Sequence, residues 1–352
     1  MANEFLDQFI RHSIYTQRLG ASNGNLFDDY LKQADRVIRD VLSNAGEISS
    51  QRLMNKINRQ LRVQMSPVYA GYGKELTDGL EALAISETEW TQKALSRGVS
   101  ATIKAPSSAQ VISAALARPM QFGNTAVVLK DLVKGFTDSE ITKVQGIVRS
   151  GFFEGQTTSQ MVQRIRGTKA ANFNDGIMAT TRRSARLIAK TSTNHFATAA
   201  KDMTYNANED VLEGVEWSST LDSRTSDVCQ LRDGQIYPVD SGPRPPAHPG
   251  CRSTIIPKVK PEFSLFTGNE TRASVGAQGA KTSQAGTYYG WLRTQPAGFQ
   301  NEVLGSTKGK LFRNAGLDNK EFRRLVSNNF DEPLTLAEIR LKEPEVFNRL
   351  SL

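Results

Sequence analysis

Apolar residues recur at three- and four-residue spacing through the first hundred positions, which predicts helices. One stripe covers positions 26 to 42, with Asn25 as its expected cap, and the chain breaks after it at Gly46. A second helix begins near position 53, and Pro67 is expected to end it because proline lacks the backbone N–H. A third stripe runs from Tyr72 to the Arg97-Gly98 pair. The pattern therefore predicts a helical bundle, and it does not reveal whether one face docks on a larger assembly.

Two later segments carry the spacing of a capping box, in which side chains satisfy the free backbone donors of a helix start. They are Thr137 with Glu140 and Thr157 with Gln160, and the two helices are expected to stop near Gly151 and Gly167. Before them, Pro106-Ser-Ser is expected to start a short helix, and positions 118 to 124 to form a loop.

The longest helix is expected between positions 175 and 205. Four basic residues gather on one face of it, and the apolar residues opposite them are expected in the core. This basic stripe admits two interpretations: a solvated or ion-paired helix face, or a surface for DNA phosphates or an acidic protein. The basic residues are Arg182, Arg183, Arg186 and Lys190, and the expected core residues are Ala185, Leu187, Ile188, Phe196 and Ala199.

The hydrophobic period changes to two between positions 207 and 260, which predicts about three short strands. Asp233-Gly234 is a strong turn signal because glycine accepts positive φ without a steric cost. The prolines from 243 to 249 make a stiff connector, and Cys229 is expected to meet the His248-Pro-Gly-Cys251 segment. We call residues 207–260 the knob.

The knob resembles the Mu F-like head morphogenesis (minor head protein) family of tailed bacteriophages. That family's pattern is a Trp, an Asp-x-Arg-Thr segment, a Cys, an Asp-Gly turn and a Pro-Pro-x-His-Pro-x-Cys-Arg close. Many members carry a second Cys three residues after the first, where this chain has Arg232, and some carry another at the position of Ser253. The matching positions are Trp217, Asp222, Arg224, Thr225, Cys229, Asp233, Gly234, Pro245, Pro246, His248, Pro249, Cys251 and Arg252.

The resemblance extends upstream to about position 125 and downstream to about position 341, where Tyr289-Gly-Trp-Leu292 and Glu302-Val-Leu-Gly305 look like the family's tail module. Thr335 and Glu338 have the spacing of one more capping box. We predict an α+β, predominantly helical fold in five segments. They are a helical N-terminal region (1–104), a central helical region (105–206), the β knob (207–260), a Gly/Ser/Thr-rich linker (261–285) and a helical C-terminal module (286–352).

The composition is basic: the chain has 44 Lys and Arg residues and 36 Asp and Glu residues, which gives a net charge of +8. This favours polyanionic partners such as DNA, although solubility alone could explain it. Two cysteines in 352 residues indicate synthesis in a reducing cytosol. No apolar run reaches the roughly 20 residues that span a bilayer, and the first residues do not resemble a signal peptide.

The two cysteines and His248 leave three interpretations open: a zinc site with Cys229, His248 and Cys251 as ligands, a disulfide in the mature particle, or packed thiols. Structural zinc needs a fourth ligand, which Asp222, Asp227 or Asp233 would have to supply. Asp222 is expected to form a turn with Arg224, and Arg252 to hold Asp222 or Asp233 in a bidentate pair. No nucleotide-binding or nucleophile motif occurs, so no catalytic residue and no required cofactor are expected.

The resemblance implies a minor head protein at the portal vertex inside the capsid, made in the host cytoplasm and carried in the virion. It implies a role in head assembly or DNA ejection. The expected partners are portal or major capsid protein and packaged duplex DNA without sequence readout, and the chain is expected to be no enzyme. The chain itself is a further candidate partner, as a homo-oligomer around the portal. The rival interpretation is a metal-dependent enzyme, nuclease or toxin-like, using His248 and nearby aspartates.

Overall fold

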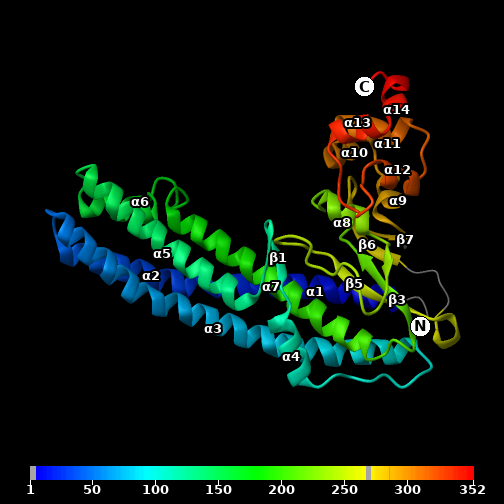
Figure 1. Ribbon diagram of the computed structural model, residues 1–352, viewed down its shortest axis with the longest axis horizontal. Helices are drawn as coiled ribbons and strands as arrows, with labels where there is room; N and C mark the ends of the chain where they lie inside the picture. Colours follow the sequence, from blue (N-terminus) through cyan, green and yellow to red (C-terminus); the bar gives the residue numbers. More distant parts are fainter. Residues whose placement is uncertain (1–4, 267–270, 285) are drawn as a thin grey trace.

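The computed structural model describes residues 5–266, 271–284 and 286–352. A long body of helices carries a small β region at one end, and a helical tail stands on that β region, directed away from the body (Figure 1). The fold is therefore α+β and predominantly helical, as the hydrophobic period predicts. No helix among the described residues is long and apolar enough to cross a membrane.

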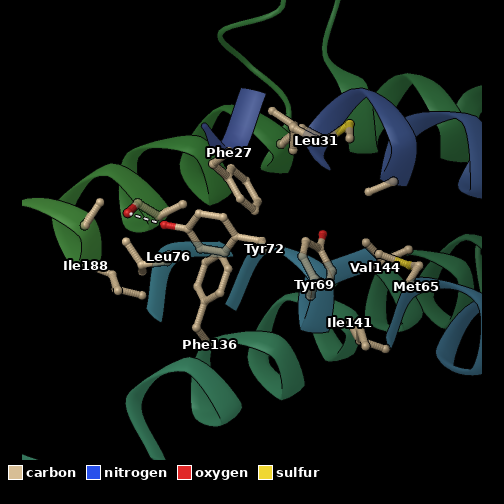
Figure 2. Close-up of a cluster of buried hydrophobic side chains, with 14 of the residues drawn as sticks. Phe27, Leu31, Met65, Tyr69, Tyr72, Leu76, Phe136, Ile141, Val144 and Ile188 are labelled. Carbon is tan, nitrogen blue, oxygen red and sulfur yellow. Dashed lines mark hydrogen bonds between the residues drawn. The ribbon is translucent and has the colours of Figure 1, made fainter. Parts of the chain in front are cut away.

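The body owes its length to one helix of 48 residues, which at 1.5 Å per residue extends for about 70 Å. Amphipathic helices pack along it and bury a continuous apolar core, in which Phe27, Tyr69, Tyr72 and Phe136 make ring contacts (Figure 2). The body helices are α1 (Phe5–Asn25), α2 (Phe27–Ala45), α3 (Gln51–Gly98), α4 (Ser108–Ala117), α5 (Leu129–Phe153), α6 (Thr158–Arg166) and α7 (Ile177–Asn206).

The predicted helix boundary at Pro67 is wrong, because α3 continues through this proline. Pro67 and Val63 both lie on the exposed face of α3, so water can reach the carbonyl of Val63 that lacks its usual donor. Asn25 is also not the cap of α2, because it is the last residue of α1 and only Leu26 separates the two helices. The N-terminal helices are thus longer and more continuous than their turn signals indicated.

Of the two predicted capping boxes in the central region, only the second starts a helix. Thr157 and Gln160 form the reciprocal pair at the start of α6, and Gly167 follows its end. Thr137 lies inside α5, where its hydroxyl donates to the carbonyl of Val133, and Gly151 lies inside the same helix. Part of the expected loop before α5 forms a hairpin of β1 (Met120–Phe122) and β2 (Thr125–Val127).

The knob contains the three strands that the sequence predicts. They form an antiparallel sheet in the order β4-β3-β5, in which Val215 lies opposite both Tyr237 and Pro257. A second apolar cluster joins this sheet to the first turns of α1 and the last turns of α3. The knob elements are β3 (Leu212–Ser218), α8 (Asp227–Arg232), β4 (Ile236–Tyr237), β5 (Thr254–Val259) and the short 3-10 helix Pro261–Phe263.

Much of the predicted linker is a β-hairpin, in which β6 (Thr271–Gly276) pairs with β7 (Gly279–Gln284). Residues 267–270 and 285 of the predicted linker lie outside the described residues. The tail after it has its own apolar core, and Thr335 and Glu338 form the predicted capping box. The tail helices are α9 (Tyr288–Arg293), α10 (Ala297–Leu304), α11 (Ser306–Asn314), α12 (Asn319–Leu325), α13 (Leu336–Lys342) and α14 (Pro344–Arg349).

Candidate functional site in the knob

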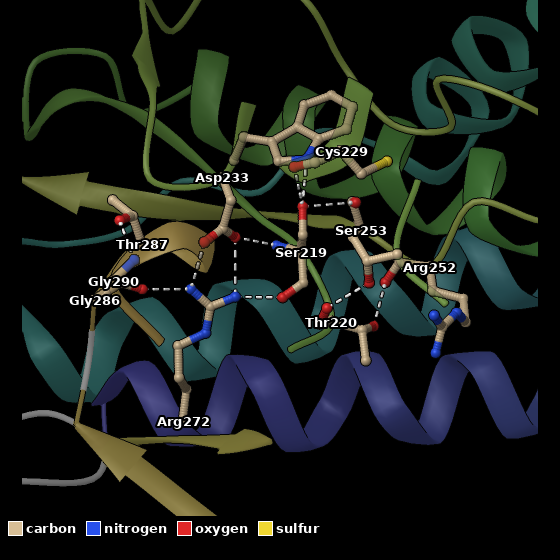
Figure 3. Close-up of polar contacts among 12 residues, drawn as sticks. Ser219, Thr220, Cys229, Asp233, Arg252, Ser253, Arg272, Gly286, Thr287 and Gly290 are labelled. Carbon is tan, nitrogen blue, oxygen red and sulfur yellow. Dashed lines mark hydrogen bonds and ion pairs between the residues drawn. The ribbon is translucent and has the colours of Figure 1, made fainter. Parts of the chain in front are cut away.

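The centre of the knob is the fully buried Trp217 on β3, whose indole N–H donates to Ser219 Oγ at 3.0 Å. Ser219 Oγ also donates to the carbonyl of Cys229 at 2.7 Å and lies 3.1 Å from Ser253 Oγ (Figure 3). These contacts join β3 to α8 and to the segment before β5. Arg232 lies over the indole ring at 5.3 Å. The residue that stands in place of the family's second cysteine therefore packs on the motif tryptophan.

Asp233 is paired with a residue that lies in the predicted linker. Arg272 on β6 places Nη1 3.0 Å from Asp233 Oδ2 and Nη2 2.9 Å from Oδ1, and both side chains are buried (Figure 3). The same guanidinium donates to the carbonyls of Ser219 and Gly286, while Asp233 Oδ1 accepts from the Ser219 N–H at 2.6 Å. One buried ion pair thus joins the turn of the knob to the hairpin and to the start of the tail.

Asp222 takes Arg252 as its bidentate partner, one of the two pairings that the sequence allowed. Nη1 lies 2.5 Å from Oδ2 and Nη2 2.7 Å from Oδ1. The turn with Arg224 is confirmed, because the Arg224 N–H donates to Asp222 Oδ1 at 3.1 Å. Burial raises the pKa of Asp222, but the hydrogen bonds and charge of Arg252 outweigh it and hold that pKa below its usual range. Asp222 is therefore a charged structural anchor.

Cys229, His248 and Cys251 meet as the sequence predicts, with their ligand atoms within 4.8 Å of one another. The two Sγ atoms lie 3.6 Å apart, and His248 Nε2 lies 3.4 Å from Cys229 Sγ and 2.7 Å from Ser226 Oγ. Two thiolates this close would repel, so one thiol ionises at the expense of the other. The hydrogen bond from Cys229 and the nearby His248 lower the pKa of Cys251, whereas the bond to Cys251 and burial raise that of Cys229.

The knob offers three of the four ligands that a structural zinc ion needs. Each aspartate proposed as the fourth ligand has another partner. Asp222 pairs with Arg252, Asp233 pairs with Arg272, and Asp227 lies 3.4 Å from the ammonium of Lys308. Among the described residues, the metal-binding group that includes His248 contains the two cysteines and no carboxylate.

The basic stripe on α7 is divided in two by the structure. Arg182 Nε and Arg186 Nη2 lie 3.1 and 3.0 Å from opposite oxygens of Asp28 on α2, so these two side chains form ion pairs within the body. Arg183 and Lys190 are exposed. Ala185, Ile188, Phe196 and Ala199 are buried as predicted, whereas Leu187 is 37% exposed and is not a core residue.

The sequence reasoning missed Arg272, Ser219 and Tyr288, whose hydroxyl donates to the carbonyl of Asp222 at 2.7 Å. Arg272 lies in the Gly/Ser/Thr-rich stretch whose composition predicts a linker. The alternation of Ala273 and Val275 before a Gly-Ala-Gln-Gly turn was the available signal for a hairpin there. Ser219 and Tyr288 have no distinctive sequence context.

These hydrogen bonds and ion pairs define a helical protein whose small sheet is closed by buried ion pairs and connected by them to the tail. The profile of the family described as "Phage Mu protein F like protein" matches residues 142–256, from α5 through the knob to β5. The chain thus contains a phage Mu protein F-like region, which confirms the resemblance carried by the knob motif. Neither the curated proteins nor the solved structures searched contain a match.

Proposed function

We propose that this chain is a minor head protein of a tailed bacteriophage that docks at the portal vertex inside the capsid and acts in head assembly, DNA ejection or both. The observation that carries the proposal is the family match over residues 142–256, which supports a phage head morphogenesis protein. The proposed action is non-covalent, with the protein made in the host cytoplasm and retained in the virion. The family match is compatible with a structural rather than an enzymatic role.

Docking on a portal or capsid protein needs apolar surface that is free in the isolated chain. The tail has such surface, since Phe330 is 80% exposed and Leu341 is 83% exposed. The tail also stands away from the long body (Figure 1). We propose that the tail supplies part of the docking surface and that the body extends toward the packaged DNA.

The proposed DNA contact is electrostatic and independent of sequence. The net charge is +8, and Arg183 and Lys190 extend from α7 without an ion pair among the described residues. Each basic side chain that neutralises a phosphate releases a counterion, so binding weakens as salt rises. Inside a filled head the local concentration of phosphate is very high, so that even weak contacts would be occupied.

A pull-down at increasing salt, with recombinant portal protein and random-sequence duplex DNA as separate baits, tests the proposal. We expect portal binding that survives high salt and DNA binding that disappears at moderate salt, because the first buries apolar surface and the second depends on counterion release. Binding to DNA alone would contradict portal docking. Binding to neither bait would contradict both parts of the proposal.

The DNA part has a matched pair of variants. Replacing Arg183 and Lys190 on α7 with Gln should reduce the log–log salt slope by about 1 for each phosphate that these side chains neutralise. The control replaces Arg52 and Arg59, two exposed basic residues on α3 with the same spacing in the sequence, and should leave the slope unchanged. Equal effects of the two double variants would exclude the α7 stripe as the DNA surface.

A further inference from the structure

A cavity of about 330 Å³ lies where α1, α7 and the end of the Pro-rich connector meet. Its volume is at the lower end of the range for small-molecule sites, about 300–1,000 Å³. Gln17 donates to the carbonyl of Arg252, and Asn194 donates to the carbonyls of Cys251 and Ser253, so α1 and α7 hold the knob side of the cavity in place. Of the residues that line this cavity, only Lys190 takes part in the proposed head protein function, through the DNA contact.

All the charged side chains that line the cavity are basic: Lys190, Lys201, Arg224 and Arg252. Two carboxylates outside the lining pair with them. Asp222 holds Arg252 closely and Arg224 at 3.6 Å, and Glu87 lies 3.8 Å from Lys201. Four cations against two carboxylates leave two positive charges unmatched, and Lys190 forms no ion pair among the described residues.

Lys201 is the most deeply buried of the four cations, with only 2% of its surface exposed. Its ammonium has three protons to donate, and one hydrogen bond to Thr254 Oγ1 at 3.0 Å is its closest contact. Burial lowers the pKa of Lys201, and Glu87 opposes this only in part. An anion in the cavity would stabilise the charged form of this side chain.

One side of the cavity is apolar, which distinguishes it from a site for a bare inorganic anion. Leu187 projects from α7 into the lining although it is 37% exposed, and Ala21 and Ala197 lie in the same lining. An exposed leucine beside a basic cavity is suited to cover the carbon skeleton of an organic ligand. Core packing does not explain the exposed position of Leu187, whereas contact with an organic ligand would explain it.

We infer that this cavity binds a nucleotide-sized organic phosphate monoester, with the phosphate between Lys190 and Arg224 and the organic part against Leu187. A phosphate monoester carries a charge of about −1.5 to −2 at neutral pH, which matches the two positive charges in excess. Arg224 and Lys190 are both exposed, so their side chains can adjust to the ligand. The inference does not depend on the head protein function.

Isothermal titration calorimetry with the full chain tests the inference, using adenosine 5′-monophosphate, thymidine 5′-monophosphate, glucose 6-phosphate, adenosine and inorganic phosphate. At least one of the three phosphate esters should bind with a Kd below about 1 mM, and adenosine should not bind measurably. The double variant Lys190→Gln/Arg224→Gln should weaken binding at least 10-fold. Arg183→Gln, an exposed arginine on the same helix outside the cavity, should have no effect.

A second variant tests the location without removing charge. Ala21 is exposed on α1 at the cavity, so Ala21→Phe should fill the space and abolish binding while leaving the melting temperature unchanged. Failure of all three esters to bind at 5 mM would overturn the inference, as would full affinity in both cavity variants. Equal affinity for inorganic phosphate and the best ester would overturn the assignment of an organic ligand.

Discussion

The helical body and the knob both have buried cores, but different interactions stabilise them. In the body, aromatic and aliphatic side chains from six helices form one core that includes Tyr72, whose hydroxyl donates to the carbonyl of Ala185 at 3.2 Å (Figure 2). In the knob, the pairs of Asp233 with Arg272 and of Asp222 with Arg252 close the structure, and Trp217 forms a small cluster with the two cysteines.

This difference indicates which substitutions each region tolerates. Apolar burial has no preferred direction, so a core of this kind accepts substitutions that keep the volume. A buried ion pair depends on geometry, and removal of one partner leaves an uncompensated charge. The knob is therefore the more easily disrupted region, although it is much smaller than the body. Its network also transmits disruption to the tail, because Arg272 and Tyr288 connect the knob to β6 and α9.

The largest effect is expected for Arg272→Met, which leaves Asp233 buried without its partner. Breaking such a pair costs about 3–5 kcal/mol, so the free energy of unfolding of the knob and tail should fall by that amount. Chemical denaturation in a Trp90→Phe/Trp291→Phe background, where Trp217 is the remaining tryptophan, separates the knob, followed by fluorescence, from the helical body, followed by far-UV circular dichroism. We expect the fluorescence transition to shift much further than the helical one.

Arg164→Met is the matched control, because Arg164 pairs with Glu154 across a partly exposed 3.1 Å contact in the body. Exposed pairs contribute about 0–1 kcal/mol, so both transitions should stay in place. The double variant Arg272→Met/Asp233→Leu should recover part of the stability, since no lone charge remains buried. A decrease under about 1 kcal/mol for Arg272→Met would show that the knob is not held by this pair.

The second prediction concerns pH and the body. Burial lowers the pKa of His195 to about 4, and its Nε2 lies 3.0 Å from the carbonyl of Ala115. Because the folded pKa lies below the unfolded value of about 6.5, the unfolded chain binds the proton first as pH falls. The contribution of neutral, buried His195 to the free energy of unfolding is thus fully present above about pH 6.5, and it is lost as pH falls from about 6.5 to 4. Lowering the pH from 7 to 4.5 should cost roughly 2–3 kcal/mol through this residue.

His195→Gln keeps a hydrogen-bond donor and removes the titration. Its free energy of unfolding should change less than that of the wild type between pH 7 and 4.5, as measured by urea denaturation at each pH. The carboxyl of Asp222 in the knob behaves differently, because its lowered pKa maintains stability until pH falls below about 4. An identical pH profile in wild type and variant would remove His195 as the source of acid sensitivity in the body.

The same contrast, between apolar packing in the body and ion pairs in the knob, explains how well the sequence predicted each region. The helical period predicted the body because the spacing of apolar residues along the chain indicates which face of each helix is buried. It failed at Pro67, whose exposed position on α3 only the packing reveals. In the knob, the motif predicted that Arg252 would pair with Asp222 or with Asp233, but the true partner of Asp233 was hidden in a presumed linker. Pairing across 39 residues has no local pattern.

The smallest effect is expected at the thiol cluster, where Cys251→Ser separates the remaining interpretations of the knob. Packed thiols contribute little beyond their burial, and a serine hydroxyl can bond to Cys229 or His248, so we expect the melting temperature to fall by less than about 2 °C. Thiol titration of the denatured wild type should then find both cysteines free, and metal analysis should find no zinc in stoichiometric amount. Two other outcomes would contradict the packed-thiol interpretation.

A larger fall in melting temperature, together with one equivalent of zinc bound to the wild type, would make the cluster a metal site with a fourth ligand from outside these three residues. A larger fall, together with no free thiols in the denatured wild type, would indicate a disulfide. Either result would mean that the knob, unlike the body, depends on a covalent or coordinate bond in addition to its ion pairs.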